Sequence, residues 1–290
     1  MMTAGTRTDI AKVEDRRIRR LPDISTHLAF WLPAANVVMQ LANPAVGYGV
    51  VESRVDSGRG DLRPIKRGRT TAQYLAVATL GSEKDRQFFH EAVHEIHAQV
   101  TSTESSPVRY NANHAGYQLW VALCLVRYYT DQWEMLHGPL SEAELDRIID
   151  IARPLGTTLN VPEARWPSTW AEYEQRFVEG LEDVTIDDTV REYLQSLTNF
   201  RVLEIRMGKL GTLAHKTIGP WNLSMTKFAV PRRIRDEMHW EITPGDLRRR
   251  RLVLAASTAL GKVLPKPLRA YYACNILDLR VRRALGISVF

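Results

Sequence analysis

Three histidines lie close together in the segment from Phe88 to Val100, which reads FFHEAVHEIHAQV. If this segment is a helix, His90, His94 and His97 fall in one narrow stripe, because residues three and four positions apart share a face. The apolar seam beside this stripe is formed by Phe89, Val93, Ile96 and Val100. His97 borders the seam most closely, so it is the histidine that we expect to reach into the interior.

The string His90-Glu91-x-x-His94 matches the H-E-x-x-H pattern, in which two histidines bind Zn²⁺ and the glutamate activates water. A catalytic zinc site needs a third protein ligand. The extended metzincin pattern would place Gly at position 97 and His at position 100, where this chain has His97 and Val100. A zinc hydrolase therefore stays open with its third ligand unidentified. A di-iron centre needs Glu-x-x-His on two helices, and the sequence offers one copy.

A haem site makes a different demand on the same helix. It needs one neutral imidazole that reaches iron from an apolar face, with cations and hydroxyls for the propionates and bulky apolar walls around the ring. His97 suits the role of axial ligand. A histidine that is hydrogen-bonded within the core would occupy the same position, so this helix alone does not decide between the two.

The composition is that of a soluble globular protein, with 290 residues, 44% of them hydrophobic and 25% charged. The two cysteines, Cys124 and Cys274, stand far apart, which fits a reducing compartment. There is no C-x-x-C-H motif, which argues against covalent c-type haem attachment. The polar N-terminus has no apolar leader, so we expect a cytoplasmic protein. The apolar stretch Leu28–Val51 contains Asn and Pro residues and predicts a pair of buried helices.

The net charge is +6, and many basic residues stand in short blocks. These blocks are RRIRR (16–20), RRIR (232–235), RRRR (248–251) and RVRR (280–283). We expect them on solvated helix faces and helix ends, and the alternative is a weak peripheral contact with an anionic membrane. No zinc finger or helix-turn-helix spacing is present, so we expect no specific nucleic-acid partner.

Helical periodicity dominates the chain, and no alternating strand pattern is present. The sequence predicts helices at 64–80, 83–100, 115–136, 142–152, 168–182, 187–212, 231–240, 244–262 and 266–285. Ser82 with Asp85 has the spacing of a capping box, and so does Ser141 with Glu144. We expect Asn113 to cap the helix at 115. The predicted fold class is therefore all-α, with a basic N-terminal arm over residues 1–23 and one domain over residues 24–290.

Seven motifs follow one another over residues 24–285. They are ANVVMQLANPAVGYGVVESRVD (35–56), RGRTTAQYLAVATLG (67–81), VHEIHAQV (93–100), YNANHAGYQLWVALCLVRYY (110–129), GPLSEAELDRI (138–148), VPRRIRDEM (230–238) and LPKPLR (264–269). In order and spacing they resemble the rubber oxygenase catalytic-domain family, which includes latex-clearing proteins and ER-bound oxygenases of the MpaB type. The resemblance implies an all-α domain whose globin-like core holds a non-covalent haem b. It also implies activation of dioxygen toward a small hydrophobic substrate.

The resemblance assigns roles to four residues. His97 matches the axial iron ligand, which is also the histidine that the helical periodicity directs inward. Arg67 and Thr71 match the family's Arg and Thr, and their spacing of four places them on one helix face. An arginine and a hydroxyl there suit a haem propionate or a distal pocket. Glu52 is the candidate for the family's catalytic glutamate, and the alternative for Glu52 is a surface residue of a helix.

Two positions depart from the pattern of the latex-clearing proteins. Thr70 replaces a lysine that can occupy the distal iron position, and Asn43 replaces a histidine that many relatives carry before the proline. We expect the pocket walls to include Met39, Tyr48, Tyr74, Tyr117 and Trp120. The alternative to an oxygenase is a non-catalytic protein that binds haem or another apolar ligand.

Overall fold

The computed structural model describes residues 18–290, and this part of the chain is all-α. It contains fourteen α-helices and no β-strand, apart from one isolated bridge between Thr101 and Asn111. The α-helices are α1 (Pro33–Leu41), α2 (Pro44–Val51), α3 (Pro64–Leu80), α4 (Glu83–His97), α5 (Ala115–His137), α6 (Glu142–Thr157), α7 (Trp170–Glu182), α8 (Asp188–Thr198), α9 (Val202–Met207), α10 (Lys209–Thr217), α11 (Gly219–Ala229), α12 (Arg232–Glu237), α13 (Pro244–Val263) and α14 (Pro267–Ala284). The predicted fold class is confirmed.

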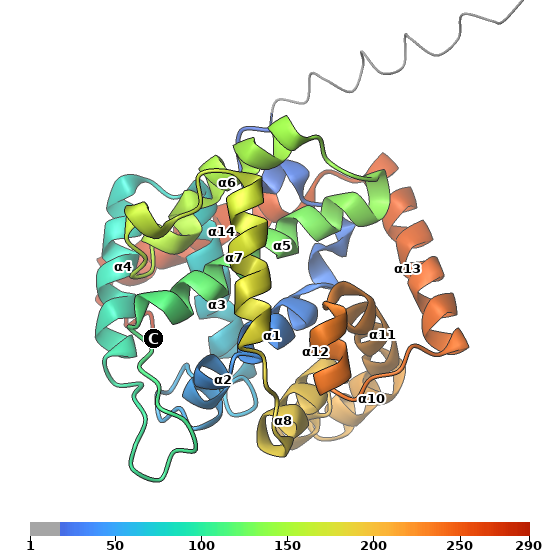
Figure 1. Ribbon diagram of the computed structural model, residues 1–290, viewed down its shortest axis with the longest axis horizontal. Helices are drawn as coiled ribbons and strands as arrows, with labels where there is room; N and C mark the ends of the chain where they lie inside the picture. Colours follow the sequence, from blue (N-terminus) through green and yellow to red (C-terminus); the bar gives the residue numbers. More distant parts are fainter. Residues whose placement is uncertain (1–17) are drawn as a thin grey trace, which may run out of the picture.

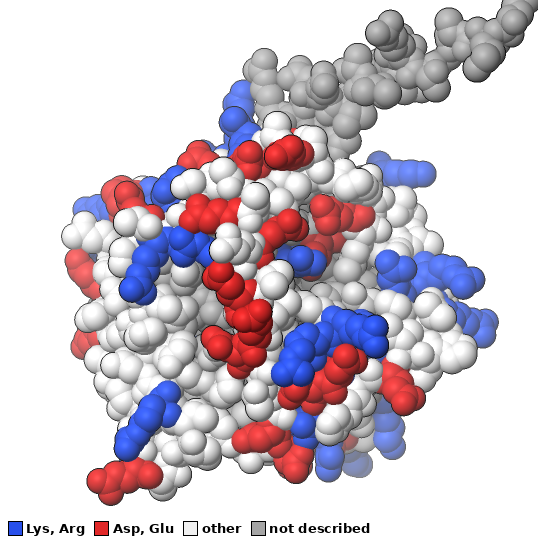
Figure 2. All heavy atoms as spheres, in the orientation of Figure 1, with Lys and Arg blue, Asp and Glu red and all other residues white. Residues whose placement is uncertain are grey.

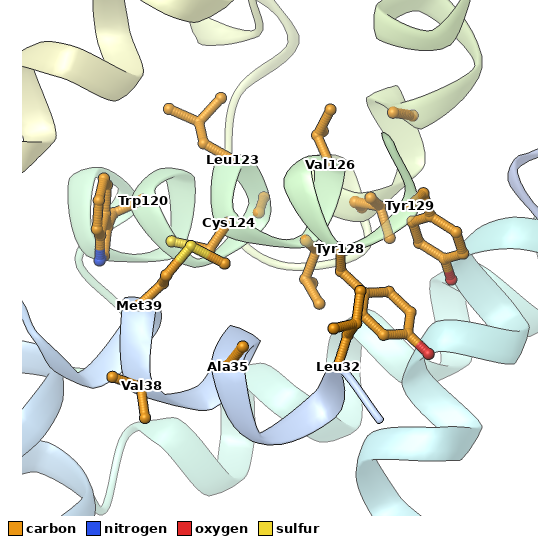
Figure 3. Packing of buried hydrophobic residues seen from close by; sticks show 14 of the residues in the cluster. Leu32, Ala35, Val38, Met39, Trp120, Leu123, Cys124, Val126, Tyr128 and Tyr129 are labelled. Atoms are coloured by element: carbon orange, nitrogen blue, oxygen red, sulfur yellow. The ribbon is translucent and has the colours of Figure 1, made fainter. Parts of the chain in front are cut away.

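Helix α5 is the central element of the fold. It crosses the middle of the molecule in Figure 1, with α7 passing over it, while α4 and α13 lie at opposite edges. Helix α1 packs along α5, and Figure 3 shows Leu32, Ala35 and Met39 directed toward α5. These side chains are almost fully buried. Each Å² of apolar surface that is buried stabilises the fold by about 25 cal/mol, so the contact between α1 and α5 is a main contribution to its stability.

The predicted pair of helices within residues 28–51 is confirmed as α1 and α2. Asn43 lies between them as the N-cap of α2, where its Oδ1 accepts from the backbone N–H groups of Ala45 and Val46. Among the described residues, no helix has both the length and the apolar character needed to cross a bilayer.

Both predicted capping boxes are present. The Ser82 hydroxyl accepts from the Asp85 N–H, and the Asp85 carboxylate accepts in return from the Ser82 N–H. Ser141 and Glu144 do the same at α6. These starts depend on contacts within four residues, so local sequence is enough to place them.

Three predicted boundaries are wrong. Helix α4 ends at His97, before the predicted Val100, because the chain turns there toward the bridge at Thr101. The segment 187–212 is not one helix, since it is interrupted at Phe200 and Gly208, which both adopt positive φ. Helix α6 continues past the predicted end to Thr157, with Pro154 inside it. Helix α11 was not predicted.

Of the expected N-terminal arm, residues 1–17 lie outside the described residues. The described remainder packs onto the domain, since Ile18 and Leu21 are buried. The Arg147 side chain also donates a hydrogen bond to the carbonyl of Ile18. The boundary between arm and body therefore has no structural break at residue 23.

The charged side chains are unevenly distributed over the face seen in Figure 2. Acidic residues gather over α7 and basic residues over α13. On α12, Arg232 and Arg233 pair with Asp236 and Glu237 one turn later. Such exposed pairs contribute about 0.3–0.5 kcal/mol each.

Candidate functional site

A cavity of about 190 Å³ lies between α2, α3, α4 and α5, with the C-terminal Phe290 and the α2–α3 loop (residues 52–63) completing its wall. Most of its lining is apolar. The apolar residues include Leu41, Val46, Val50, Phe89, Val93, Ile96, Val121 and Leu125. A concave, mostly apolar space with a few polar groups is the usual form of a small-molecule site.

His97 lines this cavity from the last turn of α4. Burial, assisted by the charge of Arg67 and by His94, lowers the pKa of His97 to about 4. The imidazole is therefore neutral near pH 7, and a neutral imidazole is the form that binds a metal ion.

Gln118 of α5 holds the ring of His97 from one side. The Gln118 Nε2 lies 3.2 Å from the His97 Nδ1 and 2.6 Å from the carbonyl oxygen of Ala112. The Gln118 Oε1 accepts from the backbone N–H of Asn160, which fixes which end of the amide faces the histidine. Gln118 is buried. Sequence reasoning missed it, and the available signal was a single amide within the apolar first half of α5.

Arg67 and Thr71 both line the cavity from α3. Burial lowers the pKa of Arg67, and the nearby Tyr193 hydroxyl acts to raise it. Within residues 18–290, no carboxylate forms an ion pair with Arg67. A buried cation without a carboxylate has a strong preference for an anionic ligand.

The Thr70 hydroxyl donates to the carbonyl oxygen of Arg67 at 3.1 Å. Thr70 also lines the cavity, and its hydroxyl is thereby tied to its own helix. The position that carries a lysine in latex-clearing proteins therefore places no basic group in this cavity.

Glu52 lies beside the cavity but does not line it. Its Oε2 accepts from the hydroxyls of Ser106 and Tyr110 at 2.6 and 2.8 Å. Tyr110 does line the cavity, and burial together with the Glu52 hydrogen bond raises the pKa of Tyr110. Glu52 thus reaches the cavity through Tyr110 and ties the loop at 102–110 to the end of α2.

Tyr74 and Tyr117 line the cavity as predicted, whereas the prediction for the other three walls is wrong. Met39 packs against α5, and Tyr48 donates to Asp187. Trp120 stacks on Phe177 and donates to the carbonyl oxygen of Gln40. Helical periodicity identifies these residues as buried but does not say which face of α5 they occupy.

The other two histidines of α4 do not enter the cavity. The His90 Nδ1 lies 2.6 Å from the carbonyl oxygen of Leu159, and His94 is exposed. In the described part of the chain, no group of three or more His, Cys, Asp and Glu side chains is placed to hold a metal ion. The zinc interpretation therefore finds no third ligand there.

The expected cap at Asn113 is wrong. Helix α5 has His114 at its N-cap position and no side-chain cap. The Asn113 Nδ2 donates instead to the carbonyl oxygen of His94, at 2.9 Å. Asn113 thus connects the start of α5 to the last turn of α4, next to His97.

Residues 25–260 match the family described as ER-bound oxygenase mpaB/B'/Rubber oxygenase, catalytic domain. Two curated relatives are uncharacterized protein Rv2237 of Mycobacterium tuberculosis and uncharacterized protein Mb2261 of Mycobacterium bovis. Each is 41% identical over 256 residues, which cover 88% of this chain and 98% of the relative. No solved structure matches the chain significantly. The chain belongs to this family of oxygenase catalytic domains.

Proposed function

We propose that this protein is a haem b-dependent oxygenase that activates dioxygen toward a hydrophobic organic substrate, with His97 as the axial ligand of the iron. One observation carries the proposal. A neutral imidazole and an arginine without a carboxylate line the same apolar cavity.

The residues present fit the chemical needs of a haem. His97 offers a nitrogen lone pair, and the apolar lining suits the faces of a porphyrin. Arg67 can pair with a propionate carboxylate, and the Thr71 hydroxyl can add a second polar contact. The cavity of about 190 Å³ is below the range of roughly 300–1,000 Å³ that holds a drug-sized ligand. We therefore expect the α2–α3 loop and Phe290 to move outward when a macrocycle binds.

Bound haem would supply the iron at which dioxygen is activated, and the protein would supply binding, orientation and exclusion of water. For the His97 Nε2 to coordinate, Nδ1 must carry the ring proton and needs an acceptor. The carbonyl oxygen of Ala112 is placed to accept this proton. Gln118 holds that carbonyl in place through its own N–H. In the ligand-free structure the Gln118 amide nitrogen faces Nδ1, so the ring proton must move from Nε2 to Nδ1 when iron binds.

Thr70 and Tyr110 also line the cavity, and neither places a charged side chain in it. The side chain of Thr70 is not basic, and its hydroxyl donates to the Arg67 carbonyl oxygen. Tyr110 carries a neutral hydroxyl held by Glu52. This arrangement gives Glu52 a positioning role that acts through Tyr110.

An absorption spectrum with iron and zinc analysis of the purified protein tests the proposal. We expect a Soret band and one iron per chain, both lost in His97→Ala and kept in His90→Ala. The matched pair is informative because both histidines belong to α4 and His97 alone of the two lines the cavity. A colourless protein whose zinc is lost in His90→Ala would support a hydrolase. A haem protein that consumes no oxygen with any electron donor would support a binding protein.

A further inference from the structure

Helices α9 and α10 form a short two-helix hairpin, which we define as residues 201–218. Gly208 joins the two helices with a φ of 50°, a conformation that favours glycine. Gly211 lets them approach closely, since a Cβ there would lie 2.3 Å from the carbonyl oxygen of Leu203. Helix α10 packs on α9 and α11. The hairpin is therefore a tightly closed unit, attached to the body through α11 and through the end of α8, where the His215 ring contacts the carbonyl oxygen of Asn199.

The hairpin exposes large apolar side chains that a folded core would bury. Five of them are between 49% and 78% exposed. They are Ile205, Met207, Leu210, Leu213 and Ile218. Single exposed apolar residues are common, but a concentration of this kind marks a surface that contacts something apolar.

Exposed cations accompany these apolar side chains. Arg201, Lys209 and Lys216 are exposed, and in the described structure none of them forms an ion pair with a carboxylate. Glu204 is the acidic residue of this segment, and it is half-buried. Apolar side chains beside unpaired cations on a short helical unit are the pattern of a segment that lies in the interface of an anionic membrane.

We propose that the α9–α10 hairpin docks this protein onto an anionic phospholipid surface. Its apolar side chains insert among the acyl chains near the headgroups, while Lys209, Lys216 and Arg201 contact the phosphates. A second copy of the chain fits less well, because a symmetric contact would bring these cations together without enough carboxylates to neutralise them. Nucleic acid would attract the cations but would leave the apolar side chains exposed.

Docking in this manner would bring one side of the cavity toward the membrane. Helix α8 leads directly into the hairpin, and the Gly60 N–H of the α2–α3 loop donates to the Tyr193 hydroxyl of α8 at 3.2 Å. The same loop lines the cavity through Ser57 and Gly58. In Figure 1, α2, α8 and α10 lie along one edge of the molecule. The hairpin and the α2–α3 wall of the cavity thus belong to the same flank.

Flotation of the purified full chain with vesicles tests the proposal. The vesicles are phosphatidylcholine alone, or phosphatidylcholine with one quarter phosphatidylglycerol. We expect binding to the anionic vesicles that weakens with added salt, because the lysines are screened. Both Leu210→Gln with Leu213→Gln and Lys209→Glu with Lys216→Glu should weaken binding about tenfold or more.

Two matched controls separate this surface from general apolar or basic character. Leu277→Gln changes an exposed leucine of α14, and Arg248→Glu with Arg251→Glu reverses two exposed cations of α13. Both controls should bind as the wild-type protein does. Circular dichroism and thermal unfolding should show that all variants are folded.

A fluorescent probe locates the contact independently. Leu210→Cys in a Cys274→Ser background, labelled with a polarity-sensitive dye, should shift its emission to the blue when anionic vesicles are added. Equal binding by the hairpin variants and the wild-type protein would overturn the proposal. So would absence of binding to either vesicle, or a dimer that Leu210→Gln with Leu213→Gln dissociates.

Discussion

Two arginines extend into this fold, and their surroundings differ. Arg127 of α5 lies 3.2 Å from the Asp131 carboxylate and stands over the ring of Phe177. Burial acts to lower the pKa of Arg127, but Asp131, Tyr173 and Glu134 together outweigh that effect, so the pKa is raised. Arg67 lines the cavity without a carboxylate, and its pKa is lowered by burial. The first region is filled and neutralised, and the second is open and cationic.

This difference distinguishes a structural core from a binding site. A core pairs its buried charges because an unpaired charge costs free energy. A site that binds an anionic ligand leaves a charge for the ligand to neutralise. Equivalent substitutions should therefore destabilise the filled region more than the cavity wall.

The largest contrast in stability should come from truncating apolar side chains. Met39→Ala, in the filled contact between α1 and α5, should lower the free energy of unfolding by about 3 kcal/mol, because it leaves a void. Val50→Ala, in the cavity wall, should cost about 1 kcal/mol or less, since space is already present there. Urea unfolding of the ligand-free protein measures both values. Equal losses would show that the cavity is as well packed as the core.

Removing the two arginines should separate the regions by their charge. Arg127→Met leaves the buried Asp131 unpaired, so we expect a loss of about 2 kcal/mol at pH 7. Arg67→Met leaves no carboxylate behind and should not destabilise the ligand-free protein. The same change should weaken haem binding about tenfold, because it removes the partner of a propionate. Equal destabilisation of the ligand-free protein by Arg67→Met and Arg127→Met would contradict the difference between the two regions.

Asp131 should give the filled region its own pH dependence. Burial raises the pKa of Asp131 to about 6 from an ordinary value of 3.8, although Arg127 opposes the shift. The folded protein therefore holds this proton more tightly than the unfolded chain, so stability is lost as the pH rises from 3.8 to about 6. The difference in unfolding free energy between the wild-type protein and Asp131→Asn should change by about 2 kcal/mol across this window. A difference that is constant with pH would contradict the shift.

The smallest contrast concerns two helical glycines. A Cβ at Gly180 of α7 would lie 2.4 Å from the Trp120 ring, so Gly180→Ala should cost about 1 kcal/mol or more. A Cβ at Gly49 of α2 would meet Tyr110 at an ordinary 3.6 Å. Gly49→Ala should therefore stabilise the ligand-free protein by about 0.5–1 kcal/mol through helix propensity. Melting temperatures that fall equally in both variants would show that α2 is packed as tightly at Gly49 as α7 is at Gly180.

The fold was predictable wherever its signals are local. The capping boxes at Ser82 and Ser141 depend on residues three positions apart and were placed correctly. The break at Phe200 was not predicted, because a positive φ at a phenylalanine is imposed by tertiary packing. Helical periodicity also cannot say which of two neighbours a buried face contacts, and this explains the incorrect placement of Trp120.

The candidate site was predictable to a similar degree. Periodicity directed His97 inward, and the family resemblance selected Arg67 and Thr71, which the structure brings to the same cavity. Their roles toward haem stay predictions. Gln118 could not be selected from the sequence, because its importance depends on the distant backbone of Asn160. The lack of a carboxylate partner for Arg67 could not be predicted from the sequence either, since it depends on which carboxylates fold nearby.

Rescue by free imidazole tests whether the side chain of His97 holds the iron. His97→Ala leaves a space beside the cavity into which imidazole can diffuse and supply the missing nitrogen. We expect haem binding and the Soret band to be lost in His97→Ala and to return when imidazole is added, while His90→Ala behaves as the wild-type protein throughout. If His97→Ala binds haem as tightly as the wild-type protein without imidazole, His97 is not the axial ligand.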